Sequence, residues 1–411
     1  MPFFLNNFKV TNKEQIIFYM TLALAFILPL SRAGISLFVI SIIVVWFLDG
    51  GLKEKFLRIK KSKVLMAVVL FVSFQVFTIM YSSDYKMALN IIRLYAYWLL
   101  IFVLVTTLKK EQVPLIITAF LYGMFISEIC AYIIFFDIYP INGKASDYPS
   151  PFMHHIEYSV FLALGAALLL NRLFSSDYSK KEKAFMAFFF ITITVNLFIS
   201  NGRTGQLAFL AAVLVTTVLH FKISLKSLAI FSFLSVSIFY GAYKTLPLFE
   251  TRVHAAQKDI HGILEGNFNS SWGIRSAYWL IAYEVLKENP LLGVGIGDYK
   301  NATKKVLETN RYDFPKPVVD FCSGYHYHNQ YLMILVQSGI LGFLMMVYML
   351  YKQATLKIDN QELKKMNVIF LSIFISAFMA ESLWLRQFSM TAFVLFCALM
   401  IASSKKEKNE L

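Results

Sequence analysis

Residues 325–344 read YHYHNQYLMILVQSGILGFL, and they join a segment with two histidines directly to a long apolar run. The run over 328–351 exceeds the roughly 20 residues that a helix needs to cross a ~30 Å hydrocarbon layer. Gln337, Ser338 and two glycines interrupt it, and glycines three residues apart would give one small face for close helix packing. The stretch therefore predicts a transmembrane helix that begins with titratable groups at the edge of the membrane.

Apolar runs of this kind recur along the whole chain. Hydrophobic residues make up 58% of the 411 positions, which is too high a share for a water-soluble domain. Twelve runs are long enough to be spanning helices: 15–31, 34–50, 64–81, 88–107, 114–136, 156–173, 184–200, 205–221, 226–243, 328–351, 366–384 and 388–404. The sequence predicts an all-α polytopic integral membrane protein with about twelve transmembrane helices.

Lysine and arginine concentrate on alternate connections between these runs. If the N-terminus is cytoplasmic, the cytoplasmic connections carry basic clusters, such as the one between Lys53 and Lys63. The positive-inside rule then places both termini in the cytoplasm. We expect transmembrane helices 1–9 within residues 1–243, a large periplasmic loop over 244–327, and transmembrane helices 10–12 with a cytoplasmic tail over 328–411.

The formal net charge of +14 follows from this asymmetry, because the excess lies on the predicted cytoplasmic side. We therefore expect the basic residues to contact anionic membrane lipids, and we expect no nucleic acid as a partner. Cys130, Cys322 and Cys397 have neither metal-ligand nor disulfide spacing.

Two outer connections are predicted to carry structure of their own. In the long loop, residues 269–290 have the signals of a helix that is too polar to span the membrane. The glycine-rich segment 291–299 predicts a structural turn rather than a phosphate loop, because no strand precedes it and no P-loop lysine follows. The loop 137–155 contains His154 and His155, and we favour a loop that lines the site over a metal centre there.

Three residues from distant parts of the chain fall on the outer face. Arg203 lies in ISNGRTG (199–205), where glycines leave the backbone open to close approach, and Arg275 lies near the start of the helix predicted over 269–290. His328 opens the tenth span. Each alone is compatible with a snorkelling or surface role. Together, two arginines suited to phosphate oxygens and one general base could move a sugar off a diphosphate.

Other polar residues are candidates for support. His326 precedes His328 by two positions, and we expect it to shape or tune that base. Glu381 and Arg386 bracket the outer hairpin of the last two spans, and Arg93 lies near the outer end of the fourth. For these three, a structural ion pair or hydrogen bond is the favoured interpretation.

The stretch from His328 resembles the signature of the bacterial O-antigen ligase family. It has His328, Asn329, nine residues, Gly339, two residues and Gly342. The SNGRTG turn around Arg203 and the RSAYW that begins at Arg275, followed by NPLLGVGIGDY, are also similar to that family. The resemblance covers residues 190–345 well, and the first half of the chain matches mainly by hydropathy.

This resemblance implies a GT-C-like membrane glycosyltransferase of the bacterial inner membrane, with its active site on the periplasmic face. It would take a glycan from undecaprenyl diphosphate and join it to a sugar hydroxyl of lipid A-core, with inversion and without metal or cofactor. The resemblance gives His328 the role of catalytic base and Arg203 and Arg275 that of binding the donor diphosphate. Asn329, His326, Glu381 and Arg93 are possible supporting residues.

Three alternative functions remain open. An O-antigen polymerase uses the same donor and a glycan acceptor, but its arginine with glycine eleven positions later does not occur here. A protein O-oligosaccharyltransferase of the same superfamily is a second alternative. A transporter or flippase would carry charged residues deep in several spans, whereas here they concentrate at one face.

Overall fold

The computed structural model describes residues 12–405, and within them the chain is helical and forms no extended strand. The all-α prediction is thereby confirmed. Residues 1–11 and 406–411, where the predicted regions 1–243 and 328–411 begin and end, lie outside the described residues.

The membrane bundle is built from helices that fall on all the predicted apolar runs. They are α1 (Lys13–Ile27), α2 (Arg32–Leu48), α4 (Lys63–Phe77), α5 (Tyr85–Tyr95) with α6 (Leu99–Thr107), α7 (Val113–Phe135), α8 (His155–Leu173), α9 (Lys180–Ile199), α10 (Arg203–Phe221), α11 (Leu225–Thr245), α16 (Gln330–Ala354), α17 (Gln361–Phe378) and α18 (Gln387–Ala402). A basic helix, α3 (Leu52–Lys61), follows α2 at an angle of 111°.

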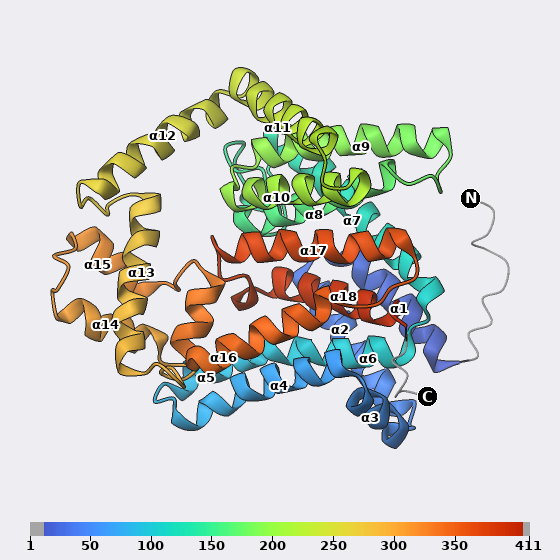
Figure 1. The fold of residues 1–411 in the computed structure, drawn as a ribbon, viewed down its shortest axis with the longest axis horizontal. Helices are drawn as coiled ribbons and strands as arrows, with labels where there is room; N and C mark the ends of the chain where they lie inside the picture. The colour runs from blue at the N-terminus through green and yellow to red at the C-terminus, as the bar shows by residue number, and fades with distance from the viewer. Residues whose placement is uncertain (1–11, 406–411) are drawn as a thin grey trace.

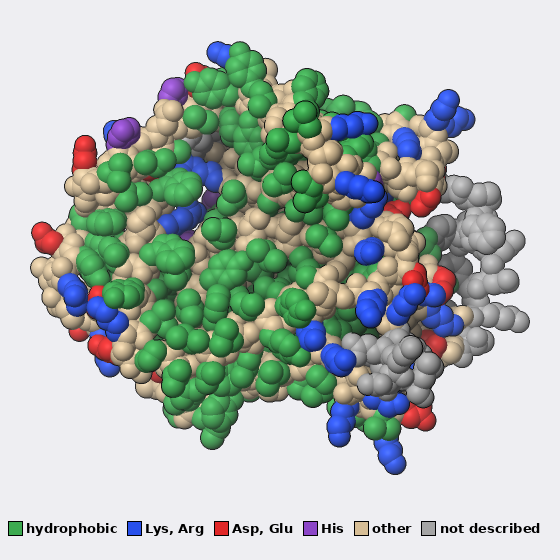
Figure 2. All heavy atoms as spheres, viewed as in Figure 1, with side chains coloured by type: hydrophobic (Ala, Val, Ile, Leu, Met, Phe, Trp, Pro, Cys, Tyr) green, Lys and Arg blue, Asp and Glu red, His purple; other side chains and the backbone are tan. Residues whose placement is uncertain are grey.

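Helix α8 is buried along nearly its whole length, as expected for a helix that is apolar all round. It packs against α9, α10 and α17, while α18 packs on α6 and α16 packs on α4 (Figure 1). In Figure 2 hydrophobic side chains cover the middle of the molecule, and many Lys and Arg side chains gather at the end that carries α3. This distribution is the one expected for a protein with a membrane-embedded belt.

Fewer helices have the length and composition of a membrane span than the sequence predicted. Among the described residues, eight helices are long and apolar enough to cross a membrane, or nine if α2 and α3 count as one span. The predicted spans at α1 and α18 hold helices of only 15 and 16 residues, and α17 begins with three charged residues, Glu362, Lys364 and Lys365. The count of twelve stays a prediction.

The region between α11 and α16 forms a helical cap at one end of the bundle. Its helices are α12 (Pro247–Leu264), α13 (Ser271–Glu288), α14 (Tyr299–Glu308) and α15 (Lys316–Gly324). Helix α13 confirms the helix predicted over 269–290, whereas the preceding α12 was not predicted. Figure 1 shows α11 and α12 arching away from the bundle before the chain returns through α13.

The glycine-rich segment 291–299 packs on a break inside α16. Gly339 has a φ of +63°, outside the helical range, and the freed Ile340 N–H donates to the carbonyl of Pro290 at 2.9 Å. A Cβ on Gly339 would lie 2.3 Å from backbone atoms of Leu291. The small face predicted from Gly339 and Gly342 is therefore only partly a helix contact, because a loop approaches Gly339 and only Gly342 faces a helix, at Gln75 of α4.

Candidate functional site

One cavity brings together the three residues that were predicted to carry the chemistry. Its volume is about 360 Å³, and Arg203, Arg275 and His328 all lie in its wall. They come from α10, α13 and the segment before α16, so the tertiary fold assembles them. Figure 2 shows a hollow between α12 and the bundle in which basic and histidine side chains are visible.

Arg203 is the first residue of α10, with Gly202 as the N-cap. A Cβ on Gly202 or Gly205 would lie 2.1 Å from Ser159 of α8, and the Gly205 N–H donates to the Ser159 hydroxyl at 3.1 Å. The close approach predicted for these glycines is therefore made by α8. This contact fixes the first turn of α10, and with it Arg203, at the wall of the cavity.

Arg275 lies one turn into α13, where Ser270 caps the helix. Its Nη1 donates to the Ser271 hydroxyl at 3.4 Å, and its Nε is buried without a hydrogen-bond acceptor among the described residues. Burial lowers the pKa of the guanidinium, whereas Glu381 and Asp259 raise it. A partly desolvated arginine with an unused donor is suited to bind an anion in the cavity.

His328 occupies the turn that leads into α16. Its φ is +47°, a left-handed conformation that is uncommon for residues other than glycine. Asn329 caps α16 by accepting from the N–H groups of Tyr331 and Leu332, and its amide donates to the carbonyl of Met379 at 3.1 Å. Asn329 therefore ties the turn of His328 to the segment that carries Glu381.

His328 and Glu381 form a close pair, although 53 residues separate them in the chain. The Nδ1 of His328 lies 3.0 Å from Oε2 of Glu381, whose side chain is fully buried. An ionised carboxylate can only accept, so in the neutral form of the ring Nδ1 carries the proton and Nε2 keeps its lone pair. Nε2 is buried and has no hydrogen-bond partner among the described residues. The ring thus has the tautomer that a general base requires.

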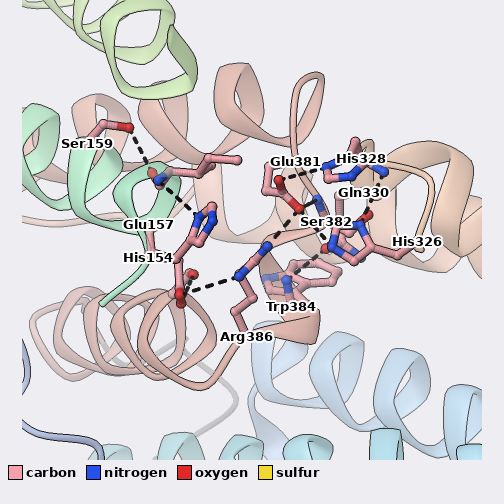
Figure 3. A network of polar contacts seen from close by, with 12 residues as sticks. His154, Glu157, Ser159, His326, His328, Gln330, Glu381, Ser382, Trp384 and Arg386 are labelled. Carbon is pink, nitrogen blue, oxygen red and sulfur yellow. Dashed lines mark hydrogen bonds and ion pairs between the residues drawn. The ribbon is translucent and has the colours of Figure 1, made fainter. Parts of the chain in front are cut away.

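Glu381 is the centre of a buried polar network (Figure 3). Burial would raise the pKa of its carboxyl, but the hydrogen bond from His328 and the neighbouring His326 and Arg386 outweigh it and lower the pKa to about 2. Oε1 accepts from the Ser382 N–H at 3.1 Å and lies 3.8 Å from Arg386 Nε. Glu381 and Arg386 thus form an ion pair with each other, whereas the sequence predicted only that each would have an ion pair or a hydrogen bond.

His326 contacts the other oxygen of the same carboxylate. Its Nε2 lies 3.3 Å from Glu381 Oε1, and its Nδ1 accepts from the backbone N–H of His328 at 3.3 Å. Burial lowers the pKa of His326 to about 4, although Glu381 raises it. A neutral His326 therefore leaves the charge of Glu381 to be balanced by Arg386.

The structure adds residues to the predicted set and leaves one apart. Tyr148 and His155 line the cavity, as expected for the loop 137–155. Glu157 was not predicted: it is buried, and its Oε2 lies 3.8 Å from Nη1 of Arg386, on the side away from Glu381 (Figure 3). The sequence signal that could have identified Glu157 is its position at the start of an apolar run, where a carboxylate is costly to bury. Arg93 is exposed on α5 and does not line the cavity.

His326, His328 and Glu381 are also the described residues most able to hold a metal ion, since one ligand atom from each lies within 4.8 Å of the others. The same atoms already pair with one another, and Arg386 lies beside the carboxylate. A nearby guanidinium opposes a second cation at Glu381. Independence from metal remains a prediction.

The fold and this cavity define a helical membrane protein with a carboxylate-oriented histidine facing two arginines. Residues 188–347 match the model of a family described as O-antigen ligase, and this segment contains Arg203, Arg275 and His328. The matched segment is less than half of the chain, and over it the chain is similar to the O-antigen ligase family.

Part of the chain is also similar to a protein whose function is not described. An uncharacterized protein of Haemophilus influenzae is 30% identical over 174 residues, which are 41% of this chain and 42% of that protein. The similarity thus spans less than half of the relative's length.

Proposed function

We propose that this protein is an O-antigen ligase that transfers a glycan from undecaprenyl diphosphate to a sugar hydroxyl of lipid A-core. The observation that carries the proposal is one cavity with Arg203, Arg275 and a His328 whose Nδ1 is held by Glu381. The site would lie on the periplasmic face of the inner membrane, where both lipid-anchored substrates can meet.

The two arginines would bind the diphosphate and neutralise the charge that develops on it as the bond to the sugar breaks. The Nε of Arg275 is a buried donor that could bind the diphosphate, and the position of Arg203 is fixed by the contact of α10 with α8. Fixed positive charge in a desolvated site stabilises a leaving group without the cost of reorganisation. No metal ion is needed for this step.

His328 would act on the acceptor. Its Nε2 would take the proton of the sugar hydroxyl as the oxygen attacks the anomeric carbon from the face opposite the diphosphate, which inverts that centre. Glu381 would stabilise the imidazolium that forms, because its carboxylate already accepts from Nδ1.

Deletion of the gene tests the proposal through the products that accumulate. We expect lipopolysaccharide with a bare core, while undecaprenyl-linked polymer accumulates on the periplasmic face. Lipopolysaccharide that carries single repeat units would instead identify a polymerase, and donor trapped on the inner face would identify a flippase. Normal lipopolysaccharide with a protein that has lost its glycans would identify a protein O-oligosaccharyltransferase.

A further inference from the structure

A second cavity adjoins the candidate catalytic cavity. Its volume is about 550 Å³, and Arg203 and Ser271 belong to the walls of both. The remaining wall is formed by the second half of α12 and by the turn that leads to α13. A ligand bound at Arg203 would therefore be within reach of both cavities.

The second cavity is polar and nearly balanced in charge. Lys258 and Arg203 face Asp259 and Glu265, and Asn267 and Asn269 add amide donors and acceptors, whereas Ala255 is the only apolar residue in the wall among those that the structure describes. Carboxylates and amides with both donors and acceptors match the hydroxyl groups of a sugar. The absence of an apolar wall and of a charge excess makes a lipid tail or a polyanion a poor fit.

We propose that this cavity is a glycan subsite that binds the sugars of the donor beyond the one attached to the diphosphate. The inference rests on the proposed function, because it takes Arg203 as a ligand of the diphosphate. Sugars that continue from that diphosphate would enter the cavity across Arg203 and Ser271. Most of the polar side chains in its wall are exposed, so a long hydrophilic polymer can leave toward solvent.

Hydrogen bonds at the first turn of α13 connect the proposed glycan subsite to the proposed diphosphate site. The Trp272 N–H donates to Asp259 of α12 at 3.4 Å, and Ser271 accepts from Arg275 at 3.4 Å. The wall of the second cavity and Arg275 thus share the first turn of α13. Glycan contacts would therefore help to position the diphosphate, because enzymes use binding energy from remote parts of a substrate to orient the reacting groups.

Gly262 offers a way to fill the subsite without strain. It lies in the cavity wall on α12, and a Cβ there would make only ordinary contacts, the nearest at 3.6 Å from the Asn267 carbonyl oxygen. We would compare Gly262→Phe with Gly241→Phe, a matched control on α11 where a Cβ meets no atom within 4 Å. Asn269→Ala, which removes an amide without adding bulk, provides a second variant.

The measurement is kcat/KM for transfer to lipid A-core from two donors, undecaprenyl diphosphate with one sugar and with several repeat units. We expect Gly262→Phe to lower the ratio of long-donor to short-donor kcat/KM about ten-fold, Asn269→Ala to lower it in the same direction, and Gly241→Phe to leave it at the wild-type value. An unchanged ratio in both cavity variants would overturn the subsite. So would a loss that disappears when the core acceptor is truncated, since this would assign the cavity to the acceptor. If the wild-type protein transfers neither donor, the proposed function itself fails.

Discussion

At the scale of single residues, the chemistry depends on how His328 is held. Its backbone is in the left-handed region, its Nδ1 is bound by Glu381, and Phe321 stacks on the ring with centroids 5.8 Å apart. Uncommon backbone conformations of this kind persist only where surrounding contacts impose them. The imidazole is thereby fixed in position and tautomer before any substrate arrives.

Glu381→Gln tests this orientation with little change of shape. We expect kcat to fall at least about 10²-fold, because the amide cannot stabilise the imidazolium and can also hold the ring in the wrong tautomer. Donor binding should change by less than about two-fold, since Arg203 and Arg275 remain. Steady-state kinetics together with a donor-binding assay would separate these effects, and a variant with wild-type kcat would remove Glu381 from the mechanism.

His326, His328 and Glu381 are the side chains that decide whether a metal takes part. We expect purified protein treated with EDTA to keep its transfer activity, because arginines neutralise the diphosphate and Glu381 is already paired. Activity should be measured before and after EDTA, with the metal content determined on the same sample. Loss of activity that added Zn²⁺ or Mg²⁺ restores would instead assign His326, His328 and Glu381 to a metal site.

Two partly buried histidines give the stability of the protein a defined pH dependence. The pKa values of His326 and His154 are lowered by burial to about 4, below the unfolded value of about 6.5. The unfolded chain therefore binds more protons, and stability present above pH ~6.5 falls as the pH decreases toward 4, by at most about 3 kcal/mol for His326 and by less for the less deeply buried His154. Glu381, with a pKa of about 2, contributes a further loss only below pH ~4.5.

Thermal unfolding in detergent between pH 7 and pH 4 would show this dependence. We expect the melting temperature of the wild-type protein to fall over this range. The melting temperature of His326→Asn should fall less steeply, because one of the two histidines is absent. The comparison uses the slope of melting temperature against pH, so a loss of stability that is equal at every pH does not affect it. Equal slopes in the two proteins would show that His326 is not buried in its neutral form.

At the scale of elements, the break in α16 connects the cap to the membrane bundle. Gly339 interrupts the helix where the segment 291–299 packs on it, and the Gln337 amide donates to the carbonyl of Ile296 at 2.9 Å. Asp298, at the end of this segment, accepts from the N–H groups of Ser83 and Asp84 before α5. The segment thus links α13 to two parts of the bundle. It thereby fixes the position of Arg275 relative to His328.

Gly339→Ala should disrupt this link. The residue has a positive φ, and the new Cβ would lie 2.3 Å from the backbone of Leu291, so we expect a loss of about 2 kcal/mol or more in stability. Gly241→Ala, in open space on α11, is the matched control and should be neutral or slightly stabilising. Melting temperatures in detergent would compare the two, and equal values would contradict the role of the break.

At the scale of the whole molecule, the sequence was most informative about what lies on one face. Hydropathy predicted where the helices lie, and the charge pattern placed Arg203, Arg275 and His328 on the same side. It could not show that Glu381 would contact His328, because residues 53 positions apart are paired only by tertiary packing. For the same reason the role of Gly339 depends on a partner segment elsewhere in the chain, and periodicity alone did not identify α12.

Reconstitution of the purified protein with both substrates tests the central claim most directly. Proteoliposomes would receive undecaprenyl diphosphate-linked glycan and lipid A-core, and the glycan-bearing lipid A-core would be quantified for the wild-type protein and for His328→Asn. We predict product with the wild-type protein and a rate lower by about 10²–10⁴ with the variant, whose donor binding is retained. Product formed at the wild-type rate by His328→Asn would contradict the base assignment, and no product from the wild-type protein would contradict the proposed ligase activity.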